Sequence, residues 1–91
     1  MNILIEKSFD RDVNKIKDQK VLSKLQDIIL KIKNAGSIGD ITQLRKLKGY
    51  DSFYRIKVGD YRLGLEETSS NDIVLIRFLH RKDIYRYFPR R

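Results

Sequence analysis

The sequence contains no cysteine and a single histidine, His80. The absence of cysteine excludes disulfide bonds and thiolate metal ligands. With one histidine, a zinc site built from protein side chains alone is not expected. We therefore predict a protein without a metal or other cofactor.

Long hydrophobic runs are also missing. The first six residues, from Met1 to Glu6, lack the basic start and long apolar core of a signal peptide. No apolar run approaches the roughly 20 residues that span a membrane. These observations predict a cytoplasmic protein with no membrane partner.

Acidic residues are few compared with basic ones. The 91 residues, which we expect to form a single domain over 1–91, include 20 Lys and Arg against 12 Asp and Glu, a formal net charge of +8. Such a charge favours an anionic partner, namely nucleic acid, a ribosome or an acidic protein. Net charge alone does not distinguish these partners from a protein that is merely basic.

Hydrophobic spacing predicts the first half of the fold. Residues 2–6 form a short strand, and a short helix begins near Arg11, with Ser8 or Asp10 as its cap. A second helix spans 21–33 and ends at Gly36 in a left-handed cap. Residues 36–50 have a loop-like composition and hold one short turn, in which Asp40 and Gln43 form a capping box.

The second half is predicted to be mostly β-sheet. Two strands, 53–58 and 61–65, meet at a tight turn at Gly59-Asp60. A central strand covers 73–79, and residues 80–86 form a short helical turn that Pro89 stops. The order predicts an α+β fold: a strand, a helical hairpin, a three-stranded antiparallel sheet and a short C-terminal helix.

The hairpin concentrates positive charge. Strand alternation places Phe53, Arg55 and Lys57 on one face and the apolar Ile56 and Val58 on the other. Arg62 follows the turn, so three cations lie close together. Like charges repel unless an anion lies among them, which indicates a polyanion site. The alternative is that these cations form cross-strand salt bridges with Asp60, Glu66 or Glu67.

A second group of candidates follows the central strand. His80 and Arg81 come directly after it, and Tyr85 lies one helical turn later. We expect this group to face the hairpin cations across one cleft. Alternatively, Tyr85 covers the core and His80 is structural. Further RNA contacts are predicted at Arg45, Lys46, Lys48, Lys82 and Arg86, although basic runs are more often simply solvated.

These residue types suit metal-free cleavage of RNA. The reaction needs a base for the 2′-hydroxyl, stabilisation of the phosphorane charge, and a proton for the 5′-oxygen. Guanidinium groups match phosphate oxygens, and aromatic rings stack on splayed bases. Arginine does not give up its proton in proteins, whereas a lysine among other cations can. The candidate bases are therefore Lys57, His80 and Tyr85.

The same residues resemble a known family. The sequence is similar to the RelE/ParE superfamily of bacterial type II toxins over essentially its whole length, and the resemblance is carried by Tyr54-Arg-Ile-Lys57, Gly59-Asp-Tyr-Arg62 and His80-Arg-Lys-Asp-Ile-Tyr85. It implies a toxin that a co-expressed antitoxin holds inactive in a hetero-oligomer. In the RelE-like branch it implies an endoribonuclease that cuts mRNA in the ribosomal A site.

The resemblance also assigns roles to single residues. Arg55 and Lys57 fall where RelE-like members have two lysines, so one candidate base is replaced and Lys57 remains. Arg62 matches an arginine that stabilises the transition state, and Arg81 matches one that acts on the phosphate or leaving group. Tyr85 matches a tyrosine that stacks on a base or transfers a proton, and His80 is a further candidate acid or base.

Two other functions remain open at this point. ParE-like members share the fold but poison DNA gyrase without acting as enzymes, and they generally lack the full set of basic residues and tyrosine. A non-toxic domain of the same fold would bind RNA or an antitoxin without cleavage.

Overall fold

A five-stranded sheet forms the centre of the computed structural model, which describes residues 1–89. Its strands are β1 (Asn2–Ile5), β2 (Leu44–Lys46), β3 (Phe53–Val58), β4 (Tyr61–Ser69) and β5 (Asp72–His80). They lie in the order β1-β5-β4-β3-β2, with β1 parallel to β5 and the other neighbours antiparallel. The α+β class is confirmed, but the sheet has two more strands than the three predicted, because β1 and β2 both join it.

The helices are α1 (Lys7–Asn14), α2 (Gln19–Asn34), the 3₁₀ turn η1 (Ile38–Asp40) and α3 (Ile84–Tyr87). The prediction that α1 begins near Arg11 is wrong, and Ser8 lies inside the helix instead of capping it. The predicted helical turn over 80–86 is shorter, since His80 still belongs to β5.

Two further local predictions are wrong. Gly36 does not adopt a left-handed conformation, because positive φ angles occur only at Gly49 and Gly59 in the described chain. The Asp40 carboxylate accepts from the backbone N–H of Ser37 and not from Gln43. The predicted turn at Gly59-Asp60 is confirmed, and Gly59 has φ 61°, a conformation that favours glycine.

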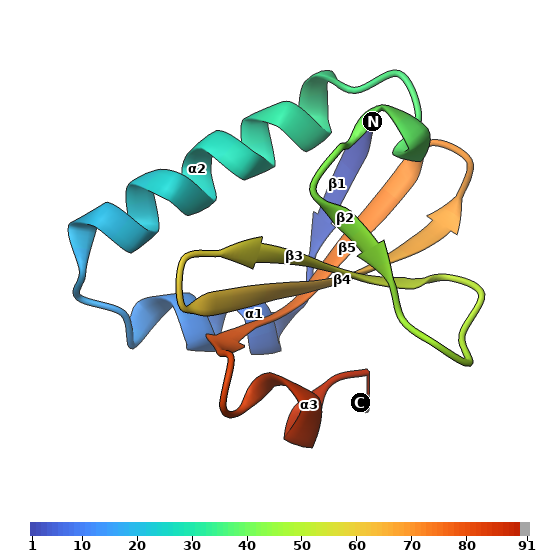
Figure 1. The fold of residues 1–91 in the computed structure, drawn as a ribbon. Coiled ribbons are helices and arrows are strands. Elements are labelled where there is room, and N and C mark those ends of the chain that lie inside the picture. The colour runs from blue at the N-terminus through green and yellow to red at the C-terminus, as the bar shows by residue number, and fades with distance from the viewer. Residues whose placement is uncertain (90–91) are drawn as a thin grey trace.

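α2 and α3 lie on opposite sides of the sheet (Figure 1). On the α2 side, Leu25 and Ile32 pack in one core with Ile56, Leu63 and Leu75. On the α3 side, Ile84 and Phe88 bury a smaller cluster with Ile76, against which Phe53 and Leu79 pack. Burial of Ile56 and Val58 on the α2 side confirms the predicted alternation of β3, which leaves Arg55 and Lys57 on the α3 side.

A bulge interrupts β5 near its middle. Leu65 pairs with Leu75 and Gly64 pairs with Arg77, so Ile76 is an extra residue. β1 ends opposite Leu75, so β5 continues without a strand on that side. Two side chains of α1 bind the backbone there: Ser8 donates to the Ile76 carbonyl at 2.6 Å, and the Phe78 N–H donates to Asp12 at 2.9 Å.

Within residues 1–89, no helix combines the length and the hydrophobicity needed to cross a bilayer.

Candidate active site

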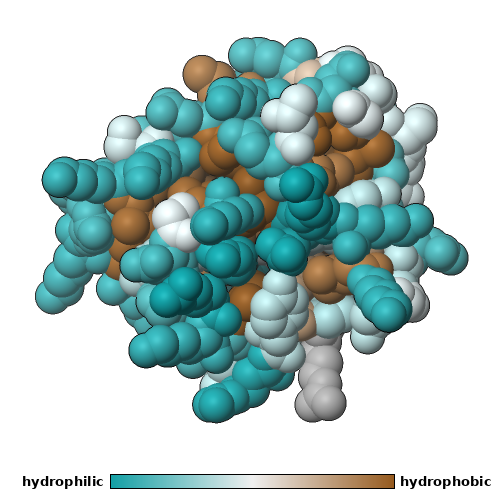
Figure 2. Space-filling model, viewed as in Figure 1, coloured by the Kyte–Doolittle hydropathy of each residue, from teal (hydrophilic) through white to brown (hydrophobic). Residues whose placement is uncertain are grey.

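The hairpin cations line an open hollow of about 580 Å³. We call it the basic hollow, and its lining residues are Gln43, Arg45, Arg55, Lys57, Gly59 and Arg62. They come from β2, β3 and β4, from the turn between β3 and β4, and from the residue that precedes β2. Figure 2 shows mostly hydrophilic residues over the region where β3 and β4 lie in Figure 1. Among residues 1–89, the wall of the hollow therefore has four cationic side chains and no acidic one.

Pairing of the strands brings like charges directly opposite one another. Lys57 pairs with Arg62 across β3 and β4, and Arg45 pairs with Arg55 across β2 and β3. Like charges at directly opposed positions destabilise a sheet. Arg55, Lys57 and Arg62 form no ion pair with any of the described residues, so the alternative of salt bridges to Asp60, Glu66 or Glu67 is not found. An anion in the hollow would relieve this repulsion.

Arg62 is held in place by the turn. Its Nη1 donates to the carbonyl of Gly59 at 3.0 Å and to the carbonyl of Tyr61 at 2.9 Å. These bonds use one nitrogen of the guanidinium group, which has five N–H donors in a planar fork. The other nitrogens make no hydrogen bond with the described residues. Arg62 is thus oriented by the backbone while most of its donors remain for an anion.

His80 does not share a face with the basic hollow. Directly opposed residues of an antiparallel pair lie on the same face, and His80 pairs with Tyr61 while Leu79 pairs with Arg62. The rings of His80 and Tyr61 are 5.6 Å apart, and Tyr61 packs on the core that α2 covers. His80 therefore lies on the opposite side of the sheet from Lys57 and Arg62, contrary to the expectation of a shared cleft.

Arg81 lies near the hairpin and Tyr85 lies on α3. Neither residue lines the basic hollow. The N–H of Arg81 donates to the carbonyl of Asp60 at 2.8 Å, which ties its backbone to the β3–β4 turn. Tyr85 is 56% exposed, while its neighbours Ile84 and Phe88 are buried. The alternative that Tyr85 covers the core is therefore wrong.

The predicted RNA-binding residues divide among several surfaces. Arg45 lines the basic hollow, whereas Lys46 and Lys48 are exposed outside it. Lys82 is exposed, and its backbone N–H donates to Nδ1 of His80 at 3.2 Å. Arg86 lines a different cavity beside α1. The five residues do not form one continuous rim around the hollow.

Asp12 is a buried acid that the sequence analysis did not single out. Its carboxylate accepts from Nε and Nη2 of Arg77 at 2.8 and 2.9 Å and also from the Phe78 N–H. The side chain of Asp12 is 3% exposed and that of Arg77 is 22% exposed. The partners are 65 positions apart, so no local pattern could have indicated the pair.

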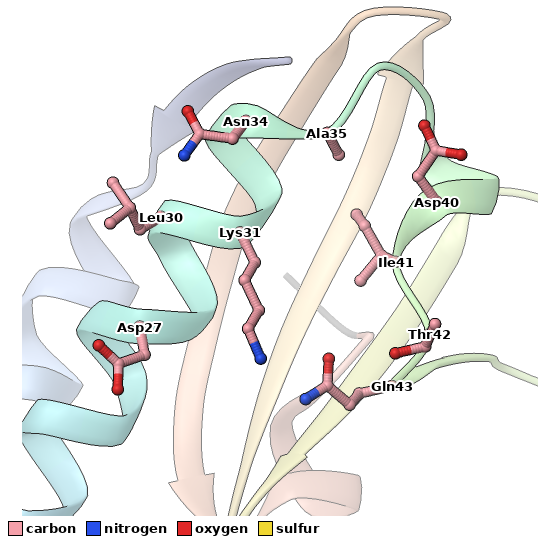
Figure 3. A pocket seen from close by; sticks show the side chains of 9 residues that line it. All are labelled: Asp27, Leu30, Lys31, Asn34, Ala35, Asp40, Ile41, Thr42 and Gln43. Carbon is pink, nitrogen blue, oxygen red and sulfur yellow. The ribbon is translucent and has the colours of Figure 1, made fainter.

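A third cavity, of about 560 Å³, lies between α2 and the segment that follows η1 (Figure 3). Lys31 reaches from α2 toward Gln43, and Asp27 and Asp40 are also in the wall. Mixed charges of this kind do not favour a polyanion, and none of the predicted site residues lies here. Within residues 1–89, no three His, Asp or Glu side chains are grouped so that they could hold a metal ion.

Comparison with known proteins identifies the family. Residues 3–85 match the model of the ParE toxin of type II toxin–antitoxin systems. The chain is 38% identical over 90 residues to Toxin RelE3 of Methanocaldococcus jannaschii, an alignment that covers 98% of this chain and 100% of that protein.

Solved structures give the same result. The toxin–antitoxin complex RelB-RelE from Methanococcus jannaschii contains a chain that superposes with a TM-score of 0.75 and 37% identity, covering 94% of this chain and 99% of that one. The YoeB dimer of Staphylococcus aureus shares the fold with a TM-score of 0.70 at 20% identity, covering 88% of this chain and 95% of that chain.

The chain therefore belongs to the RelE/ParE superfamily of type II toxins, as the sequence analysis expected. The full-length likeness to a RelE toxin makes it a toxin of the RelE type.

Proposed function

We propose that this toxin is a ribosome-dependent endoribonuclease that cleaves mRNA and thereby stops translation. The observation that carries the proposal is the basic hollow, in which Arg55, Lys57 and Arg62 converge without an ion-pair partner among the described residues. A phosphodiester that becomes a doubly charged phosphorane gains more from these cations than the ground state does.

The reaction follows from the residues in the hollow. Lys57 accepts the proton of the 2′-hydroxyl, and the 2′-oxygen then attacks the phosphorus. As the new P–O2′ bond forms, the P–O5′ bond breaks and the 5′-oxygen takes up a proton from water, and the protonated Lys57 later returns its proton to solvent. The products are a 2′,3′-cyclic phosphate and a 5′-hydroxyl end. Arg55 and Arg62 stabilise the charge that develops on the phosphorane oxygens.

The remaining predicted residues have supporting roles. Tyr85 is exposed on α3 and offers its ring to a splayed base. Arg81 is tied to the turn and contacts the phosphate or the leaving group from there. His80 is the weakest candidate for the base, because it lies on the opposite side of the sheet from Lys57. The geometry therefore favours Lys57 among the three candidates.

We also propose that a cognate antitoxin covers the basic hollow. An acidic or amphipathic segment would neutralise the opposed cations and block access of RNA to Arg62. The RelB-RelE complex and the RelBE2 toxin–antitoxin complex of Mycobacterium tuberculosis are both similar in structure to this chain, which supports a cognate antitoxin as its partner.

The function is tested by inducing the toxin in a bacterial host and mapping the ends of its mRNAs. We expect new 5′-hydroxyl ends in translated messages, and none with a toxin that carries Arg62→Ala. Purified ribosomes with a defined message then establish whether cleavage needs the ribosome. If growth stopped while messages stayed intact and gyrase–DNA complexes were trapped, the proposal would be wrong. That result would indicate ParE-like inhibition of gyrase. Unaffected growth would indicate a non-toxic domain.

A further inference from the structure

A second cavity on the α3 side of the sheet also concentrates cations. It measures about 820 Å³ and lies between α1, β5 and α3, where its wall includes Lys7, Arg11, Arg77, Arg86, Tyr87 and Glu6. We call it the α1 pocket. It shares no residue with the basic hollow, which lies on β2, β3 and β4. The two cavities therefore occupy different halves of the sheet.

Three of the cations in the α1 pocket have unmatched charge. Lys7, Arg11 and Arg86 are exposed, and none of them forms an ion pair with a residue in the described part of the chain. The charge of Arg77, in contrast, is matched by Asp12. Glu6 is the one carboxylate that the described residues place in the wall. The pocket therefore offers an excess of positive charge to solvent.

Folding does not explain the cation at Lys7. Lys7 is the first residue of the helix, where the positive end of the helix dipole disfavours a cation. Arg11 lies four residues later, and like charges at this spacing face each other and destabilise a helix. Lys7 would suit local stability better as an acidic or neutral side chain, whereas Arg11 lies in the last turn of α1, where the helix dipole favours a cation. Binding of an anion beside α1 accounts for the cation at Lys7.

Tyr87 adds an aromatic surface to the same pocket. Its ring lies 5.2 Å from the guanidinium carbon of Arg77, which Asp12 fixes on the other side. The ring remains 44% exposed. Cations beside a fixed, exposed aromatic ring are typical of proteins that bind single-stranded RNA. The RNA bases stack on the ring, and the cations bind the backbone phosphates.

We propose that the α1 pocket binds a second stretch of single-stranded RNA, which is a separate contact from the phosphate in the basic hollow. Lys7, Arg11 and Arg86 contact backbone phosphates, and Tyr87 stacks on a base. The inference deepens the proposed function, because it rests on RNA being the substrate. The α1 pocket adds affinity and orientation and takes no part in bond breaking.

The experiment measures binding of a fluorescently labelled, single-stranded 2′-O-methyl RNA, which cannot be cleaved because its 2′-oxygens are blocked. Affinity is determined by anisotropy at several salt concentrations. For single strands, each lost phosphate contact lowers the slope of log K against log salt concentration by about 0.7. For the double variant Lys7→Gln/Arg11→Gln we therefore expect a slope that is lower by about 1.4.

The matched control is Lys17→Gln/Lys20→Gln, which removes the same charge from exposed positions outside both cavities. We expect its slope to stay near that of the unmodified toxin. Equal slopes for the two double variants would overturn the proposal, because net charge alone would then explain binding. Tyr87→Ala should weaken binding roughly tenfold, the loss of one stacked base, and unchanged binding would overturn the stacking role.

A competitor and a cleavage assay separate the remaining outcomes. If polyglutamate competes as well as RNA and Tyr87→Ala has no effect, the α1 pocket takes an acidic protein chain and the proposal fails. If the toxin cleaves messages while Lys7→Gln/Arg11→Gln behaves like the control, this inference fails and the proposed function stands. If the RNA slope changes as expected but no message is cleaved, the proposed function fails and the RNA contact stands.

Discussion

The ring of Phe88 lies directly over the backbone of Gly64, so closely that a Cβ at Gly64 would stand 2.8 Å from the ring carbons. Phe88 also makes an edge contact with Phe53, at 5.7 Å between ring centroids. Glycine at this position of β4 thus allows the Phe88 ring to pack on the sheet where Gly64 pairs with Arg55 of the basic hollow on one side and with Arg77 of the α1 pocket on the other.

Gly64→Ala is expected to push Phe88 off the sheet and lower the free energy of unfolding by about 1–3 kcal/mol, the usual cost of overpacking. Urea unfolding measures the change. Gly39→Ala serves as the control, because its Cβ would meet an ordinary contact at 3.8 Å. In a Phe88→Ala background the cost of Gly64→Ala should largely vanish, and a cost that persists would contradict the role of this contact.

The buried pair of Asp12 and Arg77 gives a second prediction. Asp12→Asn removes the charge that matches Arg77 and weakens the acceptor of the Phe78 N–H, so the free energy of unfolding should fall by about 3 kcal/mol. Thermal and urea unfolding measure it. Asp10→Asn, on the exposed side of the same helix, should change stability by less than about 0.5 kcal/mol. Similar effects of the two variants would contradict the special role of Asp12.

Arg62 provides the prediction for catalysis. Arg62→Ala should lower the rate of mRNA cleavage by about 10²–10³-fold, as loss of a group that stabilises transition-state charge does. Arg62→Lys should recover only part of the rate, because a lysine keeps the charge but lacks the planar fork. Lys17→Ala, at an exposed position outside the basic hollow, is the control. Single-turnover cleavage on ribosomes gives the rates, and an Arg62→Ala rate equal to the control would exclude the assigned role.

His80 is predicted to be dispensable for the chemical step. Because it lies on the face of Tyr61, His80→Gln should leave the cleavage rate within about threefold of the unmodified toxin while lowering stability slightly through the lost ring contact. The same ribosome assay, together with urea unfolding, separates the two effects. If His80→Gln lost nearly as much activity as Arg62→Ala, the prediction would be wrong and His80 would take part in the chemical step.

The position of His80 also shows what the sequence could not predict. Uninterrupted alternation from Leu75 would place His80 on the face of Arg62. The extra residue at Ile76 reverses the phase, so that Phe78 and His80 turn to the other side. Ser8 and Asp12 bind the backbone on either side of Arg77, and both lie more than 60 positions away in the chain. A local pattern cannot show such a bulge.

Short-range sequence patterns were sufficient to predict the structural features that depend on neighbouring residues. The alternation of Ile56 and Val58 with Arg55 and Lys57, and the turn at Gly59, follow from neighbouring residues, and the structure confirms them. The sequence did not predict β2, because its three residues include two charged ones and show no alternation of apolar and polar side chains. Pairing with β3 makes these residues a strand. The convergence of Arg45 with the hairpin cations depends on that same pairing.

The parallel pairing of β1 with β5 has a consequence for synthesis of the toxin. Asn2 is among the first residues made, yet its strand partner Asp72 emerges only when most of the chain is complete. Contacts between such distant segments close a long loop, which costs chain entropy. A growing chain therefore exposes the hairpin before the sheet that orients it is closed. The five-stranded sheet is therefore complete only once β5 has been made.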